Sequence, residues 1–233
     1  WHAPGAFDPE TGERIRSEKG KSRYQDVFGA TLLELAKTND KVIGITPAMA
    51  SGCGMNKLAQ EMPGRFYDVG IEEEHAVTFA AGLAAGGMKP FCNIYSSFSQ
   101  RAYDQILHDV ALQELPVVLC FDRGGLVGED GATHHGCYDM SAYRSIPGAV
   151  IAAPKDEREL KNMMYSAMLA ETGPYIIRYP RGYGEGIQWR EKKFGYMQEG
   201  RGEKVMDGEK IADSVESKLI QTAGLFLGKQ MES

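Results

Sequence analysis

The chain has 233 residues, of which 42% are hydrophobic and 25% are charged, and its net charge is −6. This length suffices for one ordinary domain with a sizeable core. No apolar run is long enough to cross a bilayer, and the interspersed acidic and basic residues argue against a nucleic-acid surface. The four cysteines form no CxxC pair, which is typical of a reduced protein. Composition therefore predicts a cytoplasmic protein that binds neither membrane nor nucleic acid.

Changes in composition divide the chain into three parts. Residues 1–22 are polar, with turn signals and a basic stretch, and we expect a linker or arm from a preceding domain. They have neither a signal-peptide layout nor a starting methionine, so we expect a piece of a longer protein. Residues 23–186 carry regular hydrophobic periodicity and are expected to fold as the domain. Residues 187–233 are expected to be a linker toward an absent or truncated C-terminal domain.

Helical and strand-like patterns alternate within the expected domain. Apolar residues at helical spacing begin at Tyr24, and Asp156 is placed to cap a later helix. In chain order, the pattern predicts a helix from 24 to a close at 39–40, a strand over 42–45, a helix over 76–85, a strand over 91–95, a helix over 99–114, a strand over 117–121, a helix over 156–170 and a strand over 175–178.

This alternation predicts an α/β fold, with a parallel sheet and helices on both faces. Ligands of such sheets bind in the loops that follow the carboxyl ends of strands. Three of the expected loops, 96–98, 122–128 and 179–182, are polar or glycine-rich, and the last two contain an arginine. The sequence therefore predicts a ligand site at this edge of the sheet.

The acidic triplet Glu72-Glu73-Glu74 stands directly before the helix expected over 76–85 and has two interpretations. Carboxylates in a first helical turn are stabilised by the helix dipole, and this role needs no ligand. The helix is rich in alanine and glycine, however, so another backbone can approach it closely, as at a ligand or subunit contact. A carboxylate buried at the head of such a helix could share a proton with a ligand nitrogen. The pattern leaves both roles open.

The glycine-rich stretch 128–136 contains an aspartate, a threonine and two adjacent histidines. A metal site, a solvated turn and a substrate-contacting loop are all compatible with it. Adjacent histidines point in different directions in most backbones, which favours the loop and predicts no metal site. Tyr95 and Phe98 fit a core, and Arg101 and Arg181 fit ordinary surface charges as well as an anion site. The chain has no GxGxxG after a strand, no Walker A sequence and no GxSxG elbow, which argues against those three site types.

Several ordered motifs carry a resemblance to a known family. They are YDVGIEEEHAVTFAAGLAAGGMKPFCNIYSSFSQRAYDQILHD at 67–109, DRGGLVGEDGATHHG at 122–136 and IRYPRG at 177–182. Over about residues 1–184 the chain resembles the 1-deoxy-D-xylulose-5-phosphate synthases, which are thiamine-diphosphate-dependent relatives of transketolase. The YSSFSQRAYDQ segment separates this family from transketolase proper and from the β subunits of 2-oxo-acid dehydrogenases. The resemblance implies that residues 23–186 form a transketolase-like pyrimidine-binding domain.

The resemblance also implies roles for individual residues. Glu73 matches the family's glutamate that hydrogen-bonds N1′ of the aminopyrimidine, whereas Glu72 and Glu74 fall at variable positions. Phe98 matches the aromatic residue that stacks on the pyrimidine. Glu73 and His134 would be catalytic, and Glu73, Phe98 and Tyr95 would bind the cofactor. The substrate-binding set would be Tyr95, Arg101, Arg123, Asp130, His134 and Arg181, with Arg123, Arg181 and Tyr95 on the phosphate.

The implied reaction condenses pyruvate with glyceraldehyde 3-phosphate to 1-deoxy-D-xylulose 5-phosphate and CO2, a transferase step that feeds isoprenoid, thiamine and pyridoxal synthesis. The expected cofactors are thiamine diphosphate and Mg²⁺. The family's Gly-Asp-Gly…Asn motif for the metal and diphosphate does not occur in the chain, so we expect the metal ligands on another domain and this chain alone to be inactive. We also expect a homodimer. Two alternatives stay open: a split transketolase-like subunit that transfers ketol groups, and a noncatalytic, oligomer-forming binding module.

Overall fold

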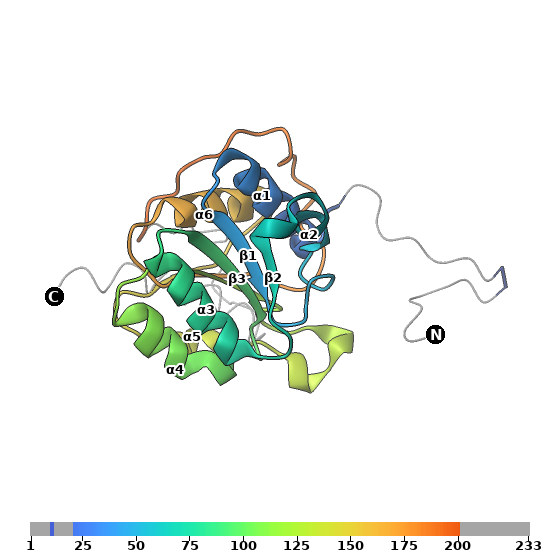
Figure 1. The fold of residues 1–233 in the computed structure, drawn as a ribbon. Helices are drawn as coiled ribbons and strands as arrows, with labels where there is room; N and C mark the ends of the chain where they lie inside the picture. Colours follow the sequence, from blue (N-terminus) through green and yellow to red (C-terminus); the bar gives the residue numbers. More distant parts are fainter. Residues whose placement is uncertain (1–9, 12–20, 201–233) are drawn as a thin grey trace.

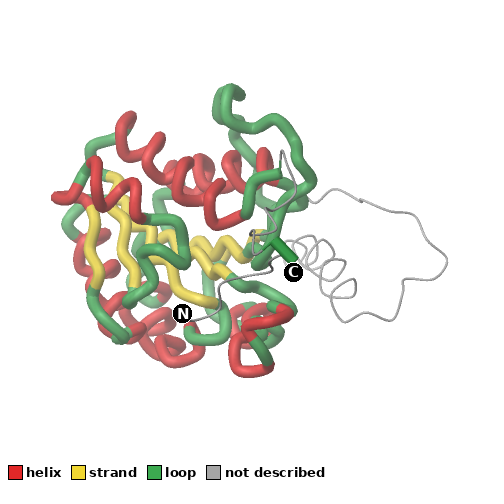
Figure 2. Tube along the Cα trace, turned by 90° about the vertical axis from the view of Figure 1, so that its right-hand side faces the viewer, coloured by secondary structure: helices red, strands yellow, loops and turns green. Residues whose placement is uncertain are grey.

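A six-stranded sheet runs through the middle of the molecule, with helices on both sides (Figure 1, Figure 2). The computed structural model describes residues 10–11 and 21–200. The strands pair in the order β2-β1-β3-β4-β6-β5, and every pairing is parallel. They are β1 Val42–Thr46, β2 Phe66–Asp68, β3 Lys89–Tyr95, β4 Val118–Asp122, β5 Val150–Ala152 and β6 Tyr175–Arg178. The predicted α/β fold with a parallel sheet is therefore confirmed.

Two layers of helices cover the sheet (Figure 1). One layer contains α1 (Tyr24–Thr38), α2 (Asn56–Glu61) and α6 (Glu157–Leu169), and the other contains α3 (Glu73–Ala85), α4 (Tyr103–Gln105) and α5 (Asp139–Tyr143). Neighbouring strand residues alternate between the two cores: Phe91 packs toward α1 and α6, and Cys92 packs toward α3. Because successive strand side chains point to opposite faces, a sheet covered on both faces has continuous apolar strands.

The predicted strands are all found, with nearly the predicted bounds. The structure adds the short edge strands β2 and β5, in which Ala152 alone is buried. The predicted cap of α6 is confirmed, since the Asp156 carboxylate accepts a hydrogen bond from Glu159 N at 2.8 Å. α3 begins at Glu73 rather than at residue 76, so two of the three acidic residues lie in its first turn.

The helix predicted over 99–114 is in fact three different segments. A 3₁₀ turn at Ser99–Ala102 leads into the short α4, and Ile106–Ala111 forms a π-helical stretch. Ser99 Oγ donates to Ser96 O at 2.7 Å at the tight start. In the wide turn, Asp109 accepts a hydrogen bond from Thr78 of α3 at 2.5 Å. Apolar spacing over so short a stretch fits several helical pitches, so the pattern could not distinguish them.

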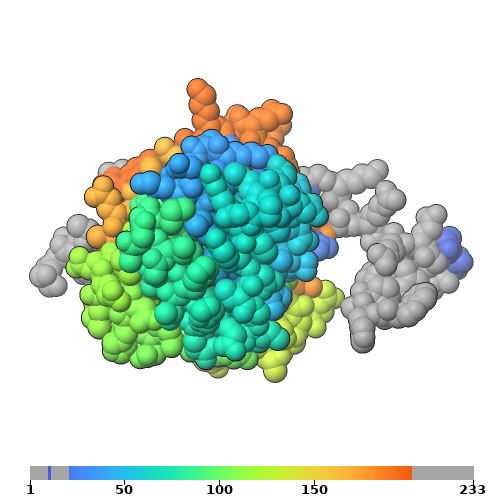
Figure 3. All heavy atoms as spheres, viewed as in Figure 1, coloured from blue at the N-terminus to red at the C-terminus, as the bar shows by residue number. Residues whose placement is uncertain are grey.

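Residues 184–200 contain no helix or strand and lie across α1 and α6 (Figure 1), where Figure 3 shows them on the outside of the α1 layer. The buried Glu157 carboxylate accepts hydrogen bonds from Glu185 N at 3.2 Å and Gly186 N at 2.8 Å. Trp189, buried, donates to Ser22 Oγ at 3.2 Å. The expected linker over 187–233 stays a prediction, because 201–233, like most of 1–22, lies outside the described residues.

No helix within residues 10–11 and 21–200 is both long and apolar enough to cross a bilayer.

The cap of α6 gives a first testable prediction. Replacing Asp156 with Ala removes the bond to Glu159 N, and we expect the free energy of unfolding to fall by about 1 kcal/mol. Urea denaturation measures it. The matched control is Asp40→Ala, at an exposed residue before β1, which should change stability by less than about 0.5 kcal/mol. Equal effects of the two variants would contradict the assigned cap.

Candidate active site

The predicted site residues lie at the carboxyl edge of the sheet. The loops after β3, β4 and β6 end there, and the first turn of α3 begins there, because α3 leads from β2 back to the amino end of β3. The strand order reverses between β1 and β3, since β2 lies on one side of β1 and all later strands lie on the other. Such a switch point opens a crevice in parallel sheets.

Glu73 is a buried carboxylate at the start of α3. Its residue is only 3% exposed, and Oε1 accepts a hydrogen bond from Arg101 Nη1 at 2.6 Å. Glu72 is exposed and Glu74 half-buried. Burying a carboxylate is costly unless it is paired, and Arg101 supplies that pairing. The three neighbouring glutamates therefore occupy different environments, and only Glu73 is positioned as an interior acid.

Phe98 lies at the centre of the cluster. The Arg101 guanidinium carbon is 4.9 Å from the centre of its ring. Tyr95 stacks on it with ring centroids 5.8 Å apart, and His134 meets it edge-on at 5.1 Å. The loop with His134 is tied to the β3 loop because Ser97 Oγ donates to Thr133 O at 2.7 Å. Phe98 thus joins the acidic end of the cluster to the histidine.

A second group of contacts continues from Tyr95. The Arg123 guanidinium carbon lies 4.0 Å from the centre of the Tyr95 ring, and Arg123 Nε is 3.7 Å from Asp130 Oδ2. The same Asp130 oxygen accepts from Arg181 Nε at 2.9 Å, and Arg181 Nη2 donates to Glu129 at 2.5 Å. Two arginines and one aspartate therefore line this end.

All eight residues singled out from the sequence thus form one continuous series of contacts. It runs from Glu73 through Arg101, Phe98, Tyr95, Arg123 and Asp130 to Arg181, and His134 joins it at Phe98. The role of each residue stays a prediction. Arg101, expected on the substrate side, contacts Glu73 and Phe98, which were expected to bind the cofactor.

A buried ion pair that sequence reasoning missed lies beneath the series. Asp139 Oδ2 accepts from Arg178 Nε at 2.9 Å and from Ser96 Oγ at 2.9 Å, and both charged side chains are almost inaccessible. Arg178 Nη2 also donates to Gly136 O at 3.4 Å. A Cβ on Gly136 would lie 2.4 Å from Arg123 O, so only glycine fits there. This pair ties the loop after β4 to the ends of β3 and β6. The one available signal was an arginine ending the apolar strand YIIR.

The pKa shifts differ between the exposed rim of the site, around Glu129 and Arg181, and its buried floor, around Tyr95 and Asp122. At the rim, the hydrogen bond from Arg181 lowers the pKa of Glu129. On the floor, burial raises the pKa of Tyr95, although the nearby Arg123 opposes this. Asp122, the last residue of β4, is 1% exposed, and burial raises its pKa to about 7, again against the effect of Arg123. Asp122 was not a predicted site residue.

The two adjacent histidines have separate environments. The His134 ring contacts Phe98, whereas His135 Nδ1 accepts a hydrogen bond from Val127 N at 3.1 Å. Within residues 10–11 and 21–200, no three His, Cys, Asp or Glu side chains gather in a way that could hold a metal ion. Cys53, Cys92 and Cys120 are buried free thiols, and burial raises the pKa of Cys53 to about 12.

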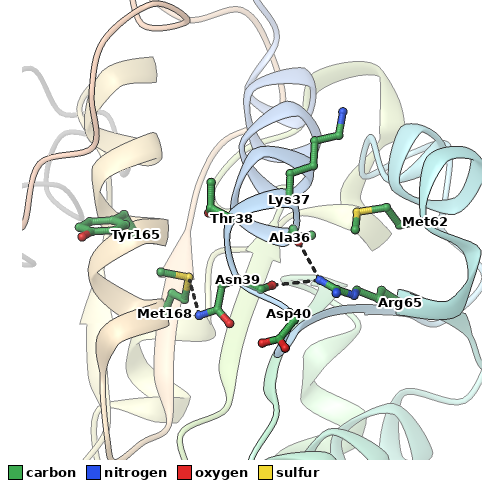
Figure 4. A pocket seen from close by; sticks show the side chains of 9 residues that line it. All are labelled: Ala36, Lys37, Thr38, Asn39, Asp40, Met62, Arg65, Tyr165 and Met168. Carbon is green, nitrogen blue, oxygen red and sulfur yellow. Dashed lines mark hydrogen bonds between the residues drawn. The ribbon is translucent and has the colours of Figure 1, made fainter.

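The open hollow of Figure 4 lies at the opposite edge of the sheet. Its volume is about 560 Å³, and it is lined by the last turn of α1, by Arg65 and by Met168 of α6. Arg65 Nη1 donates to Ala36 O at 2.7 Å and to Asn39 O at 3.0 Å, which satisfies carbonyls at the end of α1. We assign Arg65 a structural role, because none of the eight clustered residues lines this hollow.

The fold and this cluster correspond to one family. The chain belongs to the transketolase pyrimidine-binding domains: the family model described as "Transketolase, pyrimidine binding domain" matches residues 21–185. More particularly, the chain is 58% identical over 217 residues to the 1-deoxy-D-xylulose-5-phosphate synthase of Phocaeicola vulgatus, covering 91% of this chain and 34% of that protein. It is 56% identical over 214 residues to the synthase of Bacteroides thetaiotaomicron, with 91% and 33% covered. The resemblance predicted from the motifs is confirmed, and the chain spans about a third of these relatives.

Solved structures show the same fold at lower identity. A split-gene transketolase described as an inactive β4 tetramer has a TM-score of 0.67 at 24% identity, covering 78% of this chain and 58% of that one. A Pichia stipitis transketolase in complex with sedoheptulose 7-phosphate has a TM-score of 0.63 at 18% identity, covering 71% and 26%. These two likenesses concern the fold alone.

The ion pair beneath the site gives a second prediction. Replacing Asp139 with Ala leaves the buried Arg178 without its carboxylate, and we expect the free energy of unfolding to fall by about 3–5 kcal/mol in urea denaturation. The matched control is Glu61→Ala, which removes the half-exposed pair with Lys37 and should cost no more than about 1 kcal/mol. Similar losses of unfolding free energy in the two variants would show that the buried pair stabilises the protein no more than the exposed one.

Asp122 gives a third prediction, on pH. Because its pKa is raised from 3.8 to about 7 in the folded protein, the folded state holds a proton that the unfolded state has lost. Its contribution to stability is therefore complete below about pH 4 and is lost as the pH rises through 7, a change of about 4 kcal/mol at most. Urea denaturation at several pH values should show this decline in the wild type and not in Asp122→Asn. Parallel curves for the two proteins would refute the assignment.

Proposed function

We propose that this chain supplies the aminopyrimidine-binding and phosphate-binding half of a thiamine-diphosphate-dependent site, which condenses pyruvate with glyceraldehyde 3-phosphate to 1-deoxy-D-xylulose 5-phosphate and CO2. The observation that carries the proposal is the continuous series of contacts from the buried Glu73 to the paired Arg123 and Arg181. A carboxylate at one end and two guanidinium groups at the other match the two chemically different halves of such a site. The synthase relatives support the same reaction.

The Glu73 end fits the cofactor's ring. A flat, basic heterocycle needs an aromatic face and a carboxylate that can share a proton, and Phe98 and Glu73 are joined here through Arg101. Thiamine diphosphate, when bound, supplies the carbanion chemistry for breaking and forming bonds next to a carbonyl carbon. Glu73 would hold the proton at N1′ of the aminopyrimidine, and Phe98 would orient the ring. We assign no Mg²⁺ ligand to this chain.

The arginine end fits the substrate's phosphate. Guanidinium groups bind phosphate through charge-assisted, bidentate hydrogen bonds. Arg181 is already paired with Asp130 and with Glu129, but the Glu129 side chain is 79% exposed, so a phosphate can displace it at little cost. His134 contacts Phe98 from the loop that also contains Asp130, and it would hold or pass a proton at the reacting carbonyl group. Cytoplasmic localisation and a homodimer stay predictions.

A chimaera tests the proposal. Residues 21–185 would replace the matching segment of the Phocaeicola vulgatus synthase, and turnover of pyruvate with glyceraldehyde 3-phosphate would be measured. We expect the chimaera to be active and Glu73→Gln to lower kcat by about 10²–10⁴, the range for a positioned proton-transfer group. The matched control is Glu72→Gln, one residue earlier and exposed, which should stay near the parent rate.

Three results would count against the proposal. An inactive but folded chimaera would favour the noncatalytic module. Preference for a ketose phosphate over pyruvate as donor would favour the transketolase-like subunit. Near-parent turnover in Glu73→Gln would show that Glu73 takes no part in catalysis.

A further inference from the structure

The Arg123 side chain is held by three different elements of the fold. Its Nη1 donates to Asp122 Oδ2 at the end of β4 and to Gly52 O in the loop after β1, both at 2.9 Å. Its guanidinium carbon lies 4.0 Å from the centre of the Tyr95 ring at the end of β3. The side chain is only 9% exposed. An arginine normally samples many rotamers, so these contacts select one of them.

The Asp122 carboxylate accepts hydrogen bonds from both the backbone and the side chain of Arg123. Its Oδ1 accepts from the backbone N of Arg123 at 2.7 Å, while its Oδ2 accepts from the tip of the Arg123 side chain. The Arg123 backbone has a φ of +63°, which is strained for a residue other than glycine. The carboxylate therefore helps to hold a strained backbone and fixes the direction in which the guanidinium leaves it.

Gly52, in the loop after β1, contacts the Arg123 side chain through its carbonyl oxygen. A Cβ at this position would lie 2.3 Å from Tyr95 Oη and 2.7 Å from Met49 Cε. The absence of a side chain lets the loop after β1 approach close enough for its carbonyl to reach Arg123. Any larger residue would have to push Tyr95 or the loop away.

The Nε donor of Arg123 is left without a partner by this arrangement, since it is buried and makes no hydrogen bond to any of the described residues. Asp130 Oδ2 is 3.7 Å away, which is too long for a hydrogen bond, and it already accepts from Arg181. A buried donor without a partner carries a free-energy cost, which an incoming acceptor would remove. Nε lies on the side of Arg123 toward Asp130, which Arg181 also contacts.

We propose that Asp122 and Gly52 are positioning residues, which fix Arg123 so that its Nε is kept for one oxygen of a tetrahedral oxyanion such as a phosphate group. The inference deepens the proposed function, on which it rests for the identity of that anion as the phosphate of the aldehyde substrate. Asp122 and Gly52 do not touch the anion, and they act through Arg123 alone.

The test follows the Arg123 Nε–Hε signal by ¹H–¹⁵N NMR in the 233-residue chain, with sulfate as the probe. Sulfate keeps its charge across the neutral pH range, unlike phosphate. The signal is assigned by its loss in Arg123→Lys. In the wild type we expect a resolved signal that shifts on addition of sulfate. In Asp122→Asn and in Gly52→Ala we expect the signal to collapse toward the average arginine position, and sulfate affinity to fall about tenfold, the value of one charged hydrogen bond.

The direction of the change separates positioning from simple charge effects. Above pH 7, where Asp122 is ionised, Asp122→Asn removes a negative charge next to the site, so a purely electrostatic role predicts tighter sulfate binding there. Gly52→Ala changes no charge, and it keeps the test open if Asp122→Asn does not fold. Glu34→Gln is the matched control, because it neutralises a carboxylate paired with the buried Lys161 in the opposite layer. It should leave the Arg123 signal and the sulfate affinity unchanged.

The proposal is overturned if a folded variant of Asp122 or Gly52 keeps both the Arg123 signal and the sulfate affinity, if Asp122→Asn binds sulfate more tightly, or if sulfate leaves the wild-type signal unmoved. These readouts do not depend on turnover. An inactive chimaera combined with the expected NMR result would refute the proposed reaction and would still support the positioning of Arg123 by Asp122 and Gly52.

Discussion

Six parallel strands end at one edge of the sheet, and this constraint determines where the site can form. Each loop after a strand must share that edge with the others, so Gly52, Arg123 and Arg181 meet although they are far apart in the chain. The strand order reverses between β1 and β3, and the first turn of α3 brings Glu73 to the same edge. The location of the cluster is therefore a consequence of topology, whereas its chemistry depends on which side chains occupy the loop ends.

Two buried aspartates turn these loops into a defined surface. Asp139 joins Arg178 to Ser96, and Asp122 holds its neighbour Arg123. Buried ion pairs contribute little net stability, because desolvation cancels most of the attraction, but they tolerate few geometries. Their main effect here is to specify one loop conformation. Charged residues in the floor thus serve the precision of the site more than the stability of the domain.

Most of the fold could be predicted from the sequence, because the signals for helices and strands are local. A short apolar run indicates a buried strand, and Asp156 after a proline is a sufficient cap signal for α6. The site was less accessible. From residue pattern alone, Glu73 was either a first-turn acid or a functional one, and only the ordered family motifs chose between them. The buried roles of Asp122, at the start of an expected ligand loop, and of Asp139 could not be predicted, because their burial depends on contacts with segments that are distant in the chain.

The docking of residues 184–200 gives α6 a mechanical connection to the site. Arg181 lies on the short stretch between β6 and the two backbone amides that the buried Glu157 carboxylate holds at the start of α6. A short piece of chain therefore links this helix, which contributes none of the eight clustered side chains, to Arg181. A displacement of the start of α6 would reach the site along this piece of chain, because the amides that Glu157 holds follow Arg181 closely in the sequence.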